Sequence, residues 1–207
     1  MPLFKTINHN SSTKILVWKI TETFDQLLSE VRLNPKSVTR LKSMKSEVHQ
    51  LGFLSVRKLL QKTGYSDFDL FYDVFGKPHL TNGTHISISH SHQFSAIVIS
   101  DQKVGIDIEL QREKIIRIAN KFSVEELSEN VKQNYIQKLT QIWAAKEVIF
   151  KIRNEKGISF KDHIFVNPIQ TEDKSTKAIL KINNTQQEFS IHFEEIQNFV
   201  LAYAFEI

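Results

Sequence analysis

The stretch VGIDIEL, residues 104–110, alternates apolar and acidic side chains in the manner of a β-strand. Because successive side chains of a strand project to opposite faces, Asp107 and Glu109 share one face. The Val and Ile residues at the even positions share the other face, where a hydrophobic core would take them. Two neighbouring carboxylates repel each other, so this strand predicts a positive group beside them.

The chain as a whole is long enough and apolar enough to form a substantial core. It has 207 residues, 41% hydrophobic, with fifteen Phe and no Cys, so disulfides and thiolate metal sites are excluded. The start lacks the apolar segment of a signal peptide, and the longest apolar run, FVLAYAF at 199–205, suits a strand. We therefore expect a cytoplasmic protein with no membrane partner.

Apolar periodicity and turn residues predict an order of elements that occurs twice along the chain. Helices are expected over 21–31, 46–64 and 112–121, from Ser123, and over 132–153. Strands are expected at 14–20, 70–75, 85–90, 94–100 and 103–110, and again across 160–206. Connections this short favour antiparallel pairing over βαβ crossovers. The expected fold is α+β, with one subdomain over 1–100 and a second over 101–207.

Basic residues are concentrated between residues 32 and 62, which hold eight Lys or Arg and a single acid, Glu47. Such a cluster favours an anionic partner, either a phosphorylated small molecule, an acidic protein or a nucleic acid. A solvated helix face explains the same pattern.

For Asp107 and Glu109, the alternatives are a solvent-exposed sheet surface and a site for a hard cation such as Mg²⁺ or Mn²⁺. A third carboxylate is available in IWAAKEVIFK, 142–151, where Trp143, Glu147 and Lys151 share one helix face. If this helix packs beside the strand, Glu147 completes an acidic trio, and Lys146 and Lys151 neutralise a phosphate. Otherwise the pattern is an ordinary surface ion-pair network.

A third segment, GKPHLTNGTHISISHSH at 76–92, begins with a turn that presents Lys77. Its alternating serines, together with His90, are suited to holding a phosphate. The spacing of His90 and His92, with His85 upstream, alternatively suggests a zinc or iron site.

In this order, five motifs resemble the 4′-phosphopantetheinyl transferases, in their larger, pseudo-dimeric, surfactin-synthetase-activating subfamily. The motifs are GKP (76–78), SISHS (87–91), VGIDIE (104–109), KFSVEEL (121–127) and WAAKEVIFK (143–151). The resemblance implies two similar α+β subdomains, each an antiparallel sheet packed with a long helix, with coenzyme A in the cleft between them.

The resemblance also implies a reaction. The 4′-phosphopantetheine group passes from coenzyme A to a serine of an apo acyl or peptidyl carrier protein, and 3′,5′-adenosine diphosphate is released. Mg²⁺, or alternatively Mn²⁺, is expected on Asp107, Glu109 and Glu147, while Lys151 contacts the phosphates. Glu126 matches the general base; Glu125 and a metal-bound water are alternatives.

Coenzyme A is expected to contact Lys77, Ser89 and His90 and the basic segment, through Arg40 or Lys45. Relatives carry an arginine just inside the following helix, where this sequence has Glu47, Val48 and His49. Lys146 is a weaker candidate for contact with coenzyme A, and its alternative role is structural. The acidic carrier protein is expected to bind the basic residues that follow the acidic strand, namely Arg112, Lys114, Arg117 and Lys121. A monomer that does not bind nucleic acid is expected.

Three alternatives use the same residues differently. A metal-dependent phosphoesterase would release phosphate without a carrier protein. A nucleic-acid-binding module would bind oligonucleotides with a steep salt dependence but would not bind coenzyme A. An inactive scaffold is disfavoured because every expected acid and Lys151 are retained.

Overall fold

The computed structural model describes residues 3–123, 135–170 and 172–207. The chain divides into two compact units, Met1–Gln102 and Lys103–Ile207, and each is described by itself. All strand pairs of the described residues are antiparallel, and each unit packs a long helix on its sheet. The predicted α+β fold is confirmed.

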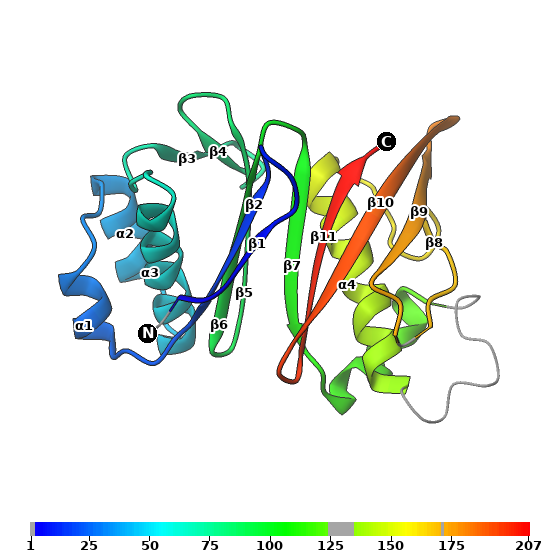
Figure 1. Ribbon diagram of the computed structural model, residues 1–207, viewed down its shortest axis with the longest axis horizontal. Coiled ribbons are helices and arrows are strands. Elements are labelled where there is room, and N and C mark those ends of the chain that lie inside the picture. Colours follow the sequence, from blue (N-terminus) through cyan, green and yellow to red (C-terminus); the bar gives the residue numbers. More distant parts are fainter. Residues whose placement is uncertain (1–2, 124–134, 171) are drawn as a thin grey trace. The chain divides into compact units, whose positions relative to one another are not determined.

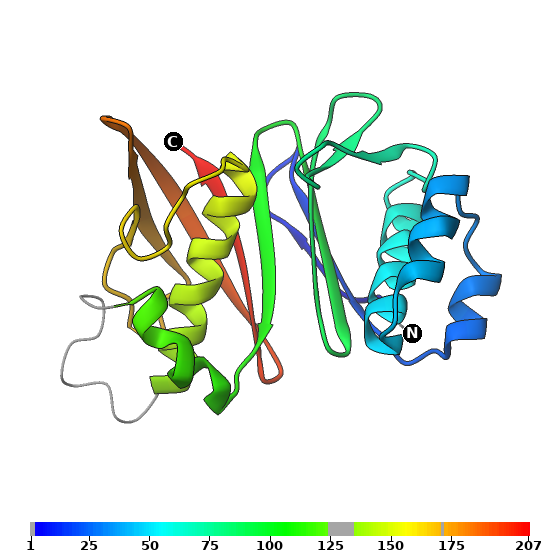
Figure 2. The ribbon, with the colours of Figure 1, turned by 180° about the vertical axis from the view of Figure 1, so that it is seen from behind.

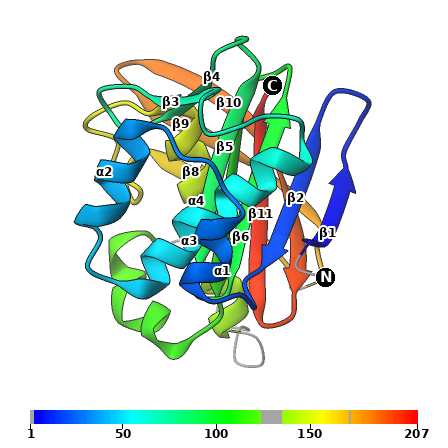
Figure 3. The same cartoon turned by 90° about the vertical axis from the view of Figure 1, so that its left-hand side faces the viewer.

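The first unit contains a four-stranded sheet in the order β1-β2-β6-β5. Its strands are β1 (Leu3–Asn8), β2 (Lys14–Lys19), β5 (His85–Ser91) and β6 (Phe94–Ser100), and its hairpin is β3 (Leu70–Tyr72) with β4 (Pro78–Leu80). Its helices are α1 (Phe24–Ser29), α2 (Pro35–Ser43) and α3 (Glu47–Lys62). Figures 1 and 3 show these helices together on one side of the sheet, with α3 against the strands.

The second unit contains a five-stranded sheet in the order β7-β11-β10-β9-β8. Its strands are β7 (Val104–Leu110), β8 (Ile164–Val166), β9 (Ser175–Ile182), β10 (Thr185–Ile196) and β11 (Phe199–Glu206). Its helices are the 3₁₀ helix η1 (Glu113–Lys121) and α4 (Tyr135–Arg153). Figure 2 shows α4 lying along the sheet beside β7.

The two units share part of their connectivity, although β1 has no counterpart in the second unit and β3 and β4 form a sheet of their own. In each, a strand (β2 or β7) leads to a long helix (α3 or α4), and the unit ends in a hairpin (β5–β6 or β10–β11). The second strand of that hairpin pairs with the strand that precedes the helices, as β6 does with β2 and β11 with β7. The twofold order expected from the sequence is therefore present in the strand pairing.

Several elements differ from the sequence-based expectation. Strand β1 and helix α2 were not predicted, and the strand expected over 70–75 ends at Tyr72. The segment after Arg112 is a 3₁₀ helix, and α4 is described from Tyr135. The sequence also predicts a helix that begins at Ser123. Apart from Ser123 itself, its first residues, 124–134, lie outside the described residues. None of the described helices combines the length and the apolar character needed to cross a membrane.

Close packing of α4 on β7 depends on small side chains. A Cβ atom built on Gly105 of β7 would lie 2.3 Å from the backbone oxygen of Val148 on α4. On the neighbouring strand, the residues that pair with Gly105 and Asp107 are both buried alanines, Ala204 and Ala202. Only a side-chain-free position lets the helix approach this strand so closely.

We predict that Gly105→Ala lowers the free energy of unfolding by about 2 kcal/mol or more, because overpacking forces the backbone apart. Urea denaturation measures the change. Ser175→Thr, which adds a carbon at an exposed strand end, is the control and should stay within about 0.5 kcal/mol of wild type. Equal stability of Gly105→Ala and wild type would contradict the tight contact.

Candidate active site

The acidic side chains of β7 lie on the face of the sheet that α4 covers. Asp107 is 3% exposed, and its Oδ1 lies 2.7 Å from Nζ of Lys151 on α4. Lys151 also donates to the backbone oxygen of Ile106 at 2.9 Å. The exposed-surface alternative therefore does not hold for Asp107. The positive group expected beside the carboxylates is, in this structure, the ammonium of Lys151.

Glu109, two residues along the same face, accepts a hydrogen bond from the indole of Trp143. Burial, followed by the charge of Asp107, raises the pKa of Glu109 to about 7. The Trp143 hydrogen bond and the charges of Lys151 and Arg112 act in the opposite direction. The ring of Trp143 packs edge-on against Phe122, 5.2 Å between centroids, and at a tilt against Phe160, 5.3 Å between centroids.

Glu147 brings a third carboxylate from α4. Burial, then the charge of Asp107, raises its pKa to about 7, and Glu109 adds to the same effect while Lys151 opposes it. These interactions place the three acids and Lys151 in one electrostatic neighbourhood. The sequence placed Trp143, Glu147 and Lys151 on one face of a helix. In the structure, this face of α4 packs against the acidic face of β7.

Among the residues described, no three His, Asp or Glu side chains are grouped closely enough to hold a metal ion as they stand. The chemistry of the donor set nevertheless fits a hard divalent cation, because all three donors are carboxylates. Two of them have a pKa raised to about 7 by burial and mutual repulsion. A bound cation would relieve that repulsion.

Lys146 differs from Lys151 although both belong to the same motif. It is fully buried, and its Nζ donates to the backbone oxygens of Phe160 and Ile164 at 2.9 and 2.7 Å. These bonds tie the segment after α4 to the helix. The structural alternative for Lys146 therefore has direct support, whereas its contact with coenzyme A stays a prediction.

In the first unit, Lys77 follows a tight turn between β3 and β4. Asp73 Oδ1 accepts from the backbone N–H groups of Phe75 and Lys77, both at 2.9 Å. Gly76 has φ of +85°, a conformation that glycine adopts without strain. The sequence GKP is thus explained locally by a turn that presents the lysine.

Ser89 and His90 are neighbours on β5 and therefore project to opposite faces of the sheet. The ring of His90 lies on the α3 side, 6.1 Å between centroids from His49, and a Cβ on Gly52 would lie 2.9 Å from it. Ser89 is buried, with 8% of its surface exposed. The structure brings His49 to His90 but does not bring the Ser89 side chain to the same side.

The basic cluster of 32–62 separates into internal and exposed members. Arg57 is buried and bonds to Asp67 at 2.9 Å, and Lys58 pairs with Glu30 at 2.7 Å. Arg40 and Lys45 are exposed, and the guanidinium of Arg40 lies 4.6 Å from the ring centroid of Tyr72. Part of the cluster therefore stabilises the fold, and the two residues singled out for coenzyme A remain accessible.

The two remaining groups of predicted residues are the candidates for the general base and the basic residues expected to bind the carrier protein. Glu125 and Glu126 lie outside the described residues. The basic residues of the 3₁₀-helix region are exposed, and a pocket of about 200 Å³ reaches from Glu109 and Trp143 to this region. Its wall also includes Arg112, Lys114, Ile115 and Ile118.

Comparison with known proteins bears on this site directly. Residues 103–204, which contain the acids and Lys151, match the 4′-phosphopantetheinyl transferase superfamily. The match covers nearly all of the second unit, Lys103–Ile207. It is also 28% identical over 153 residues to 4′-phosphopantetheinyl transferase gsp from Aneurinibacillus migulanus. That alignment covers 70% of this chain, which is more than either unit, and 62% of the relative, which is less than two thirds of its length.

The superfamily recognised from the motifs is thus confirmed, and the alignment across both units supports the larger subfamily. Sequence reasoning missed two contacts, one in each unit. The hydrogen bond from Trp143 to Glu109 had a signal, because Trp143 shares a helix face with Glu147. The approach of His49 to His90 had none, because it depends on how α3 packs on β5.

The raised pKa values predict how stability depends on pH in metal-free protein. Between about pH 4.5 and 7, Glu147 binds its proton more tightly in the folded than in the unfolded chain. Its contribution to the free energy of unfolding therefore falls as the pH rises through this window. The measurement is urea denaturation with EDTA at pH 5 and at pH 7.5. The free energy of unfolding of Glu147→Gln minus that of wild type should be larger at pH 7.5 than at pH 5. The exposed Glu188→Gln is the control, and an equal pH dependence of all three proteins would contradict the assignment.

Proposed function

We propose that this protein transfers 4′-phosphopantetheine from coenzyme A to a serine hydroxyl of an apo acyl or peptidyl carrier protein. The observation that carries the proposal is the pairing of Asp107 with Lys151 beside Glu109 and Glu147, within the segment that matches the superfamily. The serine oxygen forms a bond to the β-phosphorus. The bond from that phosphorus to 3′,5′-adenosine diphosphate breaks, and the serine proton goes to a base.

Asp107, Glu109 and Glu147 would hold Mg²⁺, with Mn²⁺ as the alternative. When bound, the cation supplies positive charge that stabilises the phosphates of coenzyme A. Lys151 supplies a second positive charge from α4, so it neutralises phosphate oxygens and stabilises the leaving group. Trp143 holds the carboxylate of Glu109 in place through its indole hydrogen bond.

Glu126 is proposed as the base for the serine proton, with Glu125 or water as the alternatives. In the first unit, Lys77, His90, Arg40 and Lys45 are proposed to contact coenzyme A.

His49 and Ser89 both lie beside His90, but only His49 brings its side chain to the His90 side of β5. His49 joins the proposal because its ring neighbours that of His90. Ser89 remains only through its backbone, because its side chain lies on the other face of β5.

The carrier protein is proposed to bind the region around the 3₁₀ helix η1. Arg112, Lys114, Arg117 and Lys121 are all exposed there, and Ile116 among them is 43% exposed. A basic surface with an apolar centre suits a partner that is acidic around its modified serine.

Intact-protein mass spectrometry of apo carrier protein, incubated with this protein, coenzyme A and Mg²⁺, tests the activity. We expect the mass of one phosphopantetheine to be added by wild type. Asp107→Ala and EDTA should each lower the rate by about a hundredfold or more, because metal stabilisation of phosphoryl charge is worth several kcal/mol. The exposed Glu188→Gln should react at the wild-type rate.

No mass gain with several carrier proteins, together with no binding of coenzyme A, would overturn the proposal. Release of phosphate without a carrier protein would then favour the phosphoesterase. Steeply salt-dependent binding of oligonucleotides would favour the nucleic-acid module.

Charge reversal tests the carrier surface. The double variant Arg117→Glu, Lys121→Glu should raise KM for the carrier protein about tenfold at low salt, and less at high salt, without a matching change in KM for coenzyme A. Lys177→Glu, an exposed lysine of β9, is the matched control. An unchanged KM for the carrier protein in the double variant would remove this surface from the proposal.

A further inference from the structure

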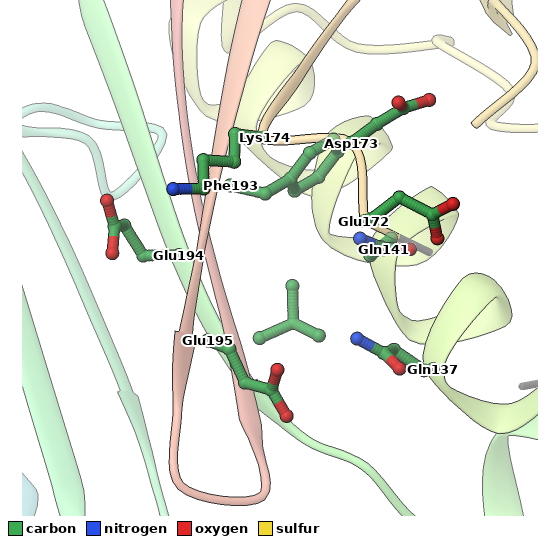
Figure 4. A pocket seen from close by; sticks show the side chains of 9 residues that line it. Gln137, Gln141, Glu172, Asp173, Lys174, Phe193, Glu194 and Glu195 are labelled. Atoms are coloured by element: carbon green, nitrogen blue, oxygen red, sulfur yellow. The ribbon is translucent and has the colours of Figure 1, made fainter. Parts of the chain in front are cut away.

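A pocket of about 260 Å³ lies in the second unit, where the β10–β11 hairpin faces the first turns of α4. None of the three acids of the candidate active site belongs to it. Figure 4 shows the side chains that line it. The lining residues are Gln137, Gln141, Glu172, Asp173, Lys174, Phe193, Glu194, Glu195 and Val200, so the pocket carries four acids and one lysine.

Strand alternation decides which carboxylates of β10 face this pocket. Glu195 pairs directly with Val200, a core residue on the helix side of the sheet. In Figure 4 the side chains of Glu195 and Gln137 point toward each other, whereas Glu194 points away. Burial and then the charge of Glu194 raise the pKa of Tyr203, which lies on the opposite face from Val200. Both Glu194 and Glu195 border the pocket, and Glu195 is the one whose carboxylate is directed toward Gln137.

Gln141 supplies an independent observation. It is 3% exposed, it forms part of the pocket wall, and its Oε1 has no hydrogen-bond partner among the described residues. A buried carbonyl oxygen without a donor is unfavourable and uncommon in folded proteins. Gln141 lies one helical turn after Gln137, so both amides belong to the same face of α4. The pocket thus offers an acceptor that requires an N–H or O–H donor.

We propose that this pocket binds an organic cation, an ammonium or guanidinium group on a short aliphatic stem. Its N–H groups would donate to Oε1 of Gln141 and to the carboxylate of Glu195, and its stem would pack on Phe193 and Val200. Acids outnumber the one lysine, Lys174, in the lining, so an anion would be repelled on balance. A purely apolar ligand would leave Gln141 unsatisfied. The volume suits a small ligand. The proposal does not depend on the transferase activity.

The test is a titration of ¹⁵N-labelled protein with n-butylammonium and with n-butylguanidinium, followed by NMR of the side-chain amides of Gln137 and Gln141. Saturable shifts of these signals are expected with the cations, and none with n-butanol or butyrate. If water alone satisfies Gln141, neither cation will produce a saturable shift, and the proposal is overturned.

Variants give the second readout. Glu195→Gln should weaken binding about tenfold or more, because it removes a charge-assisted hydrogen bond. Glu194→Gln removes the same charge from the neighbouring position and should stay within about twofold of wild type. Gln141→Leu should abolish binding without lowering Tm, since it deletes an unsatisfied acceptor. Equal weakening by Glu195→Gln and Glu194→Gln would overturn the proposal in favour of unspecific attraction.

The same chemistry has two sources, a free small amine and a lysine or arginine side chain of a polypeptide. A parallel titration with Nα-acetyl-lysine amide distinguishes them. Binding as tight as that of n-butylammonium assigns the pocket to a side chain. Binding of the butyl cations alone assigns it to a free amine.

Discussion

The direct packing of α4 on β7 is the constraint on which the candidate site depends. Gly105 has no side chain to keep the helix away, and alanines face the helix from the neighbouring strand. Only at this separation does Lys151 reach both Asp107 and the backbone oxygen of Ile106. A buried charge is unfavourable without a closely placed opposite charge, so the glycine and the ion pair are two parts of one arrangement.

The same packing assembles an arrangement that a purely structural core would avoid. Burial and neighbouring negative charge raise the pKa of both Glu109 and Glu147 to about 7, so the fold holds carboxylates where their ionised forms are disfavoured. Such local conflict is typical of functional sites, where stability is given up for a chemical task. Lys146 shows the contrast, because its buried ammonium is satisfied by two carbonyl oxygens and strengthens the fold.

The sequence predicted what depends on periodicity and on motif order. Alternation in 104–110 correctly placed Asp107 and Glu109 on one face, and helical spacing correctly grouped Glu147 with Lys151. Periodicity says which residues share a face, but not which face a helix covers, so the burial of Asp107 needed the fold. Strand β1 is half-exposed along its length, and α2 is a short polar helix that begins at Pro35, so neither had a strong apolar signal. The unsatisfied amide oxygen of Gln141 depends on the packing of α4 against β10 and β11 and has no signature in sequence.

The strand order of the second unit also has a consequence for how the protein is made. Strand β7 lies at the edge of its sheet, and its neighbour is β11, the strand furthest from it along the chain. A ribosome-bound chain that has not yet emerged as far as Phe199 would therefore carry β7 with its backbone unpaired in this sheet. Asp107 and Glu109 would then lack the scaffold that sets them against α4. Synthesis of the strand at 199–206 completes the acidic site, so truncated products of translation would not carry it.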